Sequence, residues 1–141
     1  MKQHLLARAV IFDREGRLLI AQARGWDNTF LPGGHIDPGE GAEQALVREL
    51  AEEMGVAGRA VAFLGAVEAM WPSPDPTNYE VNLVFRVEAE VGPDPVSREG
   101  HLTFRWSPLD QLDEVNFLPE AMRPLLRRYA GGDRSIWWAN A

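Results

Sequence analysis

The chain has 141 residues, 14 of them basic and 21 acidic, which gives a formal net charge of −7, and it contains no cysteine. This length predicts one domain, residues 1–141, that can bury a proper hydrophobic core. The acidic balance argues against duplex nucleic acid as a partner, and no apolar run approaches the length of a membrane span. The lack of cysteine excludes a disulfide framework and a thiol nucleophile. Together with an N-terminus that lacks the zones of a signal peptide, it indicates a cytoplasmic location.

The first part of the chain predicts strands joined by short turns. Residues 5–12 are apolar and favour a strand, residues 13–16 form a turn, and residues 18–23 return as a second strand. We therefore expect a hairpin in this region. Residues 25–29 are expected to form a loop, and Ile36 to lie in another short extended piece.

A helix is expected from about Gly41 to Met54, because Gly55 is placed to cap its C-terminus. At about 100° per residue, Glu49, Glu52 and Glu53 share one face of this helix. A second face carries the apolar residues that we expect to be buried, namely Val47, Leu50, Ala51 and Met54.

The second half of the chain predicts more strands and one more helix. Strands are expected over residues 60–69, 79–91 and 102–106, and a helix over residues 119–129. The segment between the first two strands, residues 71–78, is too rich in proline for a regular element. Strands mixed with two helices predict a sheet packed between helices.

The three carboxylates of the first helix break a local rule. Like charges within one helical turn cost a few tenths of a kcal/mol per pair on an isolated helix. The usual remedy for clustered carboxylates is a hard divalent cation, which prefers oxygen ligands. The alternative for an arbitrary helix is a surface ion pair between Arg48 and Glu52 on a solvated face.

Residues 34–56, GHIDPGEGAEQALVRELAEEMGV, carry a longer motif. Its nine defining positions are Gly34, Glu40, Arg48, Glu49, Leu50, Glu52, Glu53, Gly55 and Val56. This motif resembles the Nudix box, the signature of the Nudix (MutT-like) hydrolases. The resemblance implies an α/β/α sandwich with a mixed β-sheet between helices. It also implies hydrolysis, dependent on Mg²⁺ or Mn²⁺, of a diphosphate linkage in a nucleoside diphosphate joined to another group.

The resemblance also implies roles for the charged residues of the box. Glu52 and Glu53 are the expected metal ligands. Glu49 is either a third ligand or the base that accepts a proton from the attacking water. Arg48 is expected to orient Glu49, and Glu40 to hold Arg48 in an internal ion pair. Retention of all three helix carboxylates favours an enzyme over a nucleotide-sensing binding module of the same fold.

Three glycines have expected roles in the site. The carbonyl of Gly33 is a further candidate ligand, because glycine lets the backbone approach a ligand closely. Gly34 and Gly55 are box positions that we expect to support the structure of the site. The family often has tryptophan three residues before the proline that precedes these glycines, and this chain has Thr29 there. Phe30 and Trp26 are the candidates to supply the missing ring.

Several acidic residues outside the box compete for one further role. Members of the family often place another acidic residue on a loop before the last strand, as a ligand or a base, and Glu99 stands at that distance. The alternative is a solvated loop glutamate. Glu68 and Glu80, beside the proline-rich segment, compete with Glu99 for the role.

Substrate-binding candidates are few. His35 lies inside the box and is the histidine most suited to contact phosphate, whereas His4 and His101 are expected to be surface or packing residues. The candidates for substrate contact are Phe30, His35, Trp71 and Tyr79.

The substrate itself is left open. Pro72 stands sixteen residues after Val56, a feature associated with ADP-ribose pyrophosphatases, although turn formation alone explains prolines here. Small family members also include nucleoside triphosphate, dinucleoside polyphosphate and sugar-nucleotide hydrolases. The expected partner is a nucleotide-type small molecule. The family also suggests a homodimer, for which Trp137 and Trp138 are the only local hint.

Overall fold

The computed structural model describes residues 2–70 and 78–140. Trp71 and Pro72, which the sequence suggested for substrate contact and substrate class, lie outside the described residues. The helices are α1 (Ala42–Met54) and α2 (Met122–Ala130), with a short 3₁₀ turn, η1 (Leu109–Gln111). The strands are β1 (Lys2–Val10), β2 (Leu18–Ala23), β3 (Gly33–His35), β4 (Gly58–Met70), β5 (Asn78–Ala89), β6 (Leu102–Ser107) and β7 (Trp137–Asn140).

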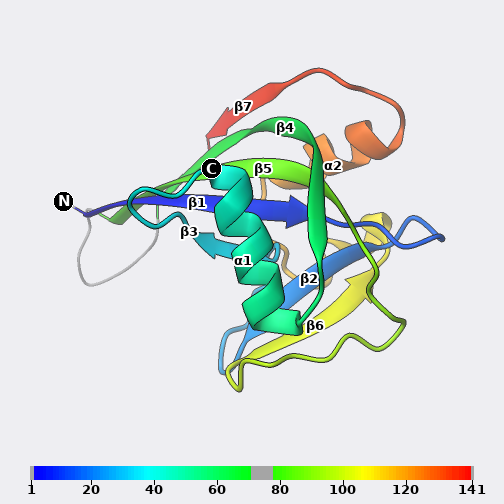
Figure 1. Ribbon diagram of the computed structural model, residues 1–141. Coiled ribbons are helices and arrows are strands. Elements are labelled where there is room, and N and C mark those ends of the chain that lie inside the picture. The colour runs from blue at the N-terminus through cyan, green and yellow to red at the C-terminus, as the bar shows by residue number, and fades with distance from the viewer. Residues whose placement is uncertain (1, 71–77, 141) are drawn as a thin grey trace.

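The strands form two sheets. A five-stranded sheet has the order β3-β1-β5-β4-β7, and β2 pairs with β6 in a two-stranded sheet. The larger sheet is mixed, because β1 runs antiparallel to β3 and parallel to β5, while β4 runs antiparallel to β5 and parallel to β7. Figure 1 shows α1 in front of this sheet and α2 on its far side.

Alternating residues of the strands supply a core on each face of the sheet. The cluster on the α1 side includes Ala7, Ala9, Phe85 and Val87 from the sheet and Leu46, Leu50 and Met54 from the helix. The cluster on the α2 side includes Val10, Val67 and Val84 from the sheet and Met122 and Leu126 from the helix. The predicted sandwich of a mixed sheet between helices is thus confirmed. Among the described residues, no helix is both long and apolar enough to cross a membrane.

The expected hairpin of residues 5–12 and 18–23 is wrong. The turn at residues 13–16 exists, but only an isolated bridge between Phe12 and Leu18 joins the two strands beyond it. Both edges of β1 are already paired, one with β3 and one with β5. β2 pairs instead with β6 and is buried on both faces, because Leu19 belongs to the α1-side cluster and Leu18 to the α2-side cluster.

The C-terminal strand β7 was not predicted. It runs parallel to β4 at the edge of the larger sheet and carries the two tryptophans near the end of the chain. Trp137 is half-buried and packs against the α2-side cluster, as expected of a packing residue. Trp138 points the other way and is 65% exposed.

Candidate active site

The helix α1 begins and ends close to where the sequence placed it. The backbone N–H of Gly41 donates to the side chain of Gln44 at 2.8 Å, which caps the N-terminus. At the other end, Gly55 adopts the left-handed conformation, with φ of 69°, and donates its N–H to the carbonyl of Ala51 at 2.9 Å. Gly55 therefore ends the helix directly after its carboxylates.

The expected buried face of α1 is partly wrong. Val47 and Ala51 are exposed, whereas Glu53 is only 6% exposed. The helix is rotated about its axis relative to the expectation, and the buried stripe consists of Ala45, Leu46, Leu50, Glu53 and Met54. Glu53 is therefore separated from Glu52, whose side chain is 52% exposed.

The guanidinium of Arg48 connects the acidic residues of α1 and of the segment before it to the end of β3. Its guanidinium makes two hydrogen bonds to the Glu40 carboxylate, from Nε at 2.7 Å and from Nη2 at 2.9 Å, which form the ion pair that the family resemblance implies. Nη1 donates to Glu49 at 3.1 Å and to Glu52 at 3.3 Å. Nη2 also reaches the carbonyl of His35 at 3.1 Å. Nη2 also lies 3.3 Å from the Asp37 carboxylate, so one planar cation contacts four carboxylates and the end of β3.

The hydrogen bond from Arg48 has an electrostatic consequence for Glu40. Together with a bond from the backbone N–H of Asp37 at 3.0 Å, it lowers the pKa of Glu40 to about 2. Glu40 is therefore ionised at neutral pH, and both of its carboxylate oxygens are bound to Arg48.

Gly34 provides the space that the Glu49 carboxylate occupies. A methyl group at Gly34 would lie 2.6 Å from Cδ of Glu49 and 2.8 Å from both carboxylate oxygens. Its neighbour Gly33 has φ of 137°, and a methyl group there would overlap the carbonyl oxygen of Ala7 in β1. The two glycines allow β3 to lie between β1 and the carboxylates of α1.

Glu53 is a buried carboxylate beside Glu49. Burial, followed by the negative charge of Glu49, raises the pKa of Glu53 to about 8, while Arg8 and the backbone of Gly33 act in the opposite direction. One of its oxygens, Oε2, is buried without a hydrogen-bond partner among the described residues. A buried polar atom without a partner is costly and needs an explanation, of which a bound ion is one.

A buried polar network lies next to these carboxylates, and of its members the sequence indicated Glu80 but neither Arg8 nor Asn82. Arg8 donates from Nε to Asn82 at 3.2 Å and from Nη1 to the carbonyl of Leu31 at 3.1 Å, and it lies 5.6 Å from the ring centre of Phe30. Asn82 in turn donates to Glu80 at 3.1 Å. The available signal was an arginine inside an apolar strand and two polar residues that alternate with apolar ones in β5.

The charges around Arg8 offset its burial. Burial lowers the pKa of Arg8, and the carboxylates of Glu80, Glu53 and Glu49 counteract this, in that order. Glu80 is itself buried, and its Oε2, like that of Glu53, has no hydrogen-bond partner among the described residues. Arg8 is thus a partly buried counter-charge shared between Glu80 and the carboxylates of α1.

The side chains of the remaining candidates make other contacts. His35 Nε2 lies 3.0 Å from His4 Nδ1, so the two rings form a pair at the end of β3. A hydrogen bond with Glu68 raises the pKa of Tyr79. Glu99 lies on the loop before β6, and its carboxylate makes no hydrogen bond or ion pair within the described parts of the chain. The structure does not bring Glu99 into contact with the helix carboxylates.

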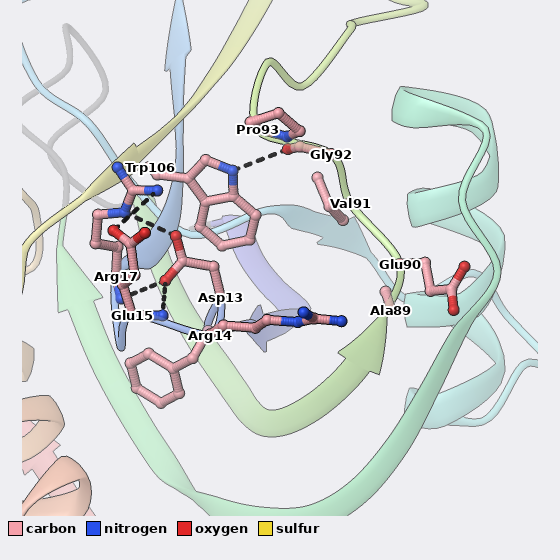
Figure 2. Close-up of a pocket in the computed structure, with 11 residues that line it drawn as sticks. Asp13, Arg14, Glu15, Arg17, Ala89, Glu90, Val91, Gly92, Pro93 and Trp106 are labelled. Atoms are coloured by element: carbon pink, nitrogen blue, oxygen red, sulfur yellow. Dashed lines mark hydrogen bonds and ion pairs between the residues drawn. The ribbon is translucent and has the colours of Figure 1, made fainter.

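In residues 2–70 and 78–140, no three Asp, Glu or His side chains converge on a point where a metal ion could bind. The reason is local, because Glu52 is turned toward Arg48 while Glu53 faces the interior. A separate cavity of about 720 Å³ contains none of the predicted site residues. It lies between the turn after β1 and the end of β5, with Trp106 on its wall (Figure 2).

The arrangement described above belongs to a known class of proteins. The NUDIX domain family matches residues 2–129, and the chain is therefore a member of the Nudix family. An ADP-ribose pyrophosphatase of Methanocaldococcus jannaschii is 31% identical over 58% of this chain and 49% of its own length. An RNA pyrophosphohydrolase of Serratia proteamaculans is 44% identical over 40% of this chain and 33% of its own length. The chain thus matches under half the length of either relative.

The fold has close counterparts among solved structures. A mutator MutT protein from Bacillus halodurans superimposes with a TM-score of 0.75 at 14% sequence identity, over 97% of this chain and 88% of that one. At this identity the similarity concerns the fold alone.

The fit between Gly34 and Glu49 gives a first test of the site. Gly34→Ala is expected to lower kcat about 10- to 100-fold, because the added methyl group displaces the Glu49 carboxylate. The free energy of unfolding is expected to change by less than about 1 kcal/mol, because Gly34 has an ordinary φ and the obstructing group is the movable end of a side chain. Gly92→Ala is the matched control, since a methyl group there meets nothing within 4 Å. Full activity in Gly34→Ala would contradict a role for Glu49.

Proposed function

We propose that this chain is a Mg²⁺-dependent Nudix hydrolase that cleaves the diphosphate linkage of a nucleoside diphosphate joined to another group. The observation that supports this most is the pair of carboxylates Glu49 and Glu53. Arg48 and Gly34 hold Glu49 in place, and Glu53 keeps one oxygen buried and unpartnered. The names of the two relatives, both pyrophosphate-cleaving enzymes, support the same chemistry.

The donor set suits a hard divalent cation, which prefers carboxylate and carbonyl oxygens. Glu52, Glu53 and the carbonyl of Gly33 would hold Mg²⁺, or Mn²⁺ in its place, with Glu49 as a further ligand if Glu99 is the base. The unpartnered oxygen of Glu53 supports this assignment. Glu52 would have to exchange its 3.3 Å contact with Arg48 for the metal. When bound, such an ion neutralises charge on phosphate oxygens and lowers the pKa of an attacking water.

The chain's own residues would orient the reactants and move a proton. Water adds to phosphorus, the phosphorus–oxygen bond of the diphosphate bridge breaks, and a carboxylate accepts the proton of the water. Glu49 is the candidate base whose carboxylate Arg48 already orients at 3.1 Å. Glu99 is the alternative base, and it would have to approach from its loop. Phe30, whose ring centre lies 5.6 Å from the Arg8 guanidinium carbon, is a candidate to contact the nucleobase of the substrate.

ADP-ribose is the first substrate to test. The relative with that activity matches the larger share of this chain, 58%, and Pro72 stands at the position associated with it. Nucleoside triphosphates and dinucleoside polyphosphates are the alternatives within the same chemistry. A nucleotide-sensing module without turnover is the alternative outside it, and the retained carboxylates speak against it.

A product assay with Mg²⁺ tests the proposal. The panel contains ADP-ribose, a sugar nucleotide, a dinucleoside polyphosphate and a nucleoside triphosphate, and the double variant Glu52→Gln/Glu53→Gln serves as the blank. We expect one substrate to be cleaved by the wild type and not by the blank. Tight nucleotide binding without turnover by a folded wild type would instead favour the sensing module.

A further inference from the structure

The loop between β5 and β6, residues 90–101, is hydrogen-bonded to the rest of the molecule near its start, in its middle and near its end. Near its start, the indole N–H of Trp106 donates to the carbonyl of Gly92 at 3.0 Å (Figure 2). Near its end, the backbone N–H of Arg24 donates to the carbonyl of His101 at 2.8 Å. In between, the backbone N–H of Arg98 donates to the carbonyl of Glu53 at 2.7 Å. The middle attachment joins the loop directly to the helix that carries the carboxylates.

The side chain of Arg98 strengthens this attachment through the charge of the helix end. The last turn of α1 contains no basic residue, although a cation there is favourable because it interacts with the unpaired carbonyls. A methyl group at Gly55 would overlap the Arg98 guanidinium, which therefore lies against the C-terminal cap of α1. Arg98 thus supplies from another segment the positive charge that the helix lacks. Gly55 is needed for this contact as well as for the left-handed cap.

The next residue in the loop is Glu99, and its backbone is fixed. The hydroxyl of Ser97 accepts a hydrogen bond from the Glu99 N–H at 3.0 Å and donates to the Glu99 carbonyl at 2.7 Å. Arg98 is therefore one residue from Glu99 and bonded through its backbone to Glu53. A shift of Arg98 would move Glu99 relative to the carboxylates of α1.

We propose that Arg98 is a positioning residue. It holds the loop of residues 90–101 in a fixed position against α1 and affects hydrolysis through Glu99. This inference rests on the proposed function, because Glu99 acts only if the chain hydrolyses a diphosphate. It assigns Arg98 no contact with substrate. The residue's effect on the reaction is geometric, since small displacements of a catalytic group lower rates strongly.

Arg98→Ala tests the contact directly. We expect kcat to fall about 10-fold with KM within about twofold of the wild type. We also expect amide hydrogen exchange at residue 98 to accelerate at least about 10-fold, because its bond to Glu53 is weakened. Arg98→Lys keeps a cation at the helix end and should recover part of both losses. The matched control is Arg59→Ala, an exposed arginine paired with Glu88 at 2.6 Å, which should change neither quantity.

A double-mutant cycle with Glu99→Gln separates positioning from a general structural role. If Arg98 acts through Glu99, Arg98→Ala causes no further loss of kcat in the Glu99→Gln background. Additive losses, or unchanged exchange and kcat in Arg98→Ala, would overturn the role of Arg98 while leaving the hydrolase intact. A folded wild type that cleaves nothing in the substrate panel would overturn the proposed function itself. The exchange measurement would then still show whether Arg98 holds the loop.

Discussion

Glu53→Gln is expected to make the metal-free protein more stable while it abolishes hydrolysis. Glu53 is 6% exposed, and its Oε2 is buried without a partner among the described residues. Glutamine keeps the shape of the side chain, removes the need to bury a charge and can donate a hydrogen bond to Glu49. Loss of a metal-binding carboxylate should reduce kcat at least about 1,000-fold, which corresponds to about 4 kcal/mol of barrier.

The pH dependence of this effect has a definite sign. The pKa of Glu53 is raised to about 8 by burial and by the charge of Glu49, from an ordinary value near 4.5. Between these two values the unfolded chain loses the proton while the folded chain keeps it. The free energy of unfolding therefore falls as pH rises through this window, and the loss is complete above pH 8. Glu53→Gln removes this loss, and its advantage should grow by about 1.4 kcal/mol per pH unit across this window, to several kcal/mol above pH 8.

Urea unfolding in EDTA at several values between pH 5 and pH 9 measures this difference. Glu52→Gln is the matched control, because its side chain is 52% exposed and its removal should change the unfolding free energy little. Saturating Mg²⁺ should stabilise the wild type and leave Glu53→Gln nearly unaffected, because a ligand stabilises only the state that binds it. A metal-free Glu53→Gln protein that is less stable than the wild type at pH 8 would show that Arg8 outweighs the burial of the ionised carboxylate.

The extent of α1 could be predicted because its signals are local. Gly55 adopts the left-handed conformation that ends the helix, and the expected bounds agree with the structure to within a residue. The orientation of the helix could not be predicted in the same way. Periodicity indicates which residues share a face, but the sheet decides which face is buried. Val47 and Ala51 were therefore expected to be buried and are exposed, while Glu53 is buried.

Features that depend on pairing between distant segments could not be predicted from local sequence patterns. The Arg8–Asn82 bond joins residues that are 74 positions apart, and it exists because β1 and β5 lie side by side in parallel. This pairing and the pairing of β1 with β3 occupy both edges of β1, which excludes β2 and makes the expected hairpin wrong. The strand β7 was missed because it has only four residues and is ordered by its contact with β4. Local patterns predict elements, whereas the composition of a site follows from which elements become neighbours.

Arg48→Lys is expected to reduce kcat about 100-fold although it preserves the positive charge. The guanidinium binds Glu40 through two nitrogens and uses a third to reach Glu49 and Glu52. An ammonium group is a single point of charge and cannot make these contacts at once. Without them the Glu49 carboxylate is free to rotate, and its repulsion of Glu52 favours displacement from the site.

The free energy of unfolding at acid pH tests the contact between Arg48 and Glu40 independently of activity. Arg48 is the main reason that the pKa of Glu40 lies at about 2. A lowered carboxylate pKa contributes stability above its ordinary value, and this contribution is lost as pH falls toward the lowered one. The wild type should therefore lose stability between about pH 4.5 and pH 2 more steeply than Arg48→Lys does. Arg17→Lys is the matched control, because Arg17 pairs with Asp13 at 2.7 Å away from the site and should leave kcat unchanged. Equal kcat values for Arg48→Lys and the wild type would show that a positive charge alone suffices at this position. The planar guanidinium would then not be needed to orient Glu49.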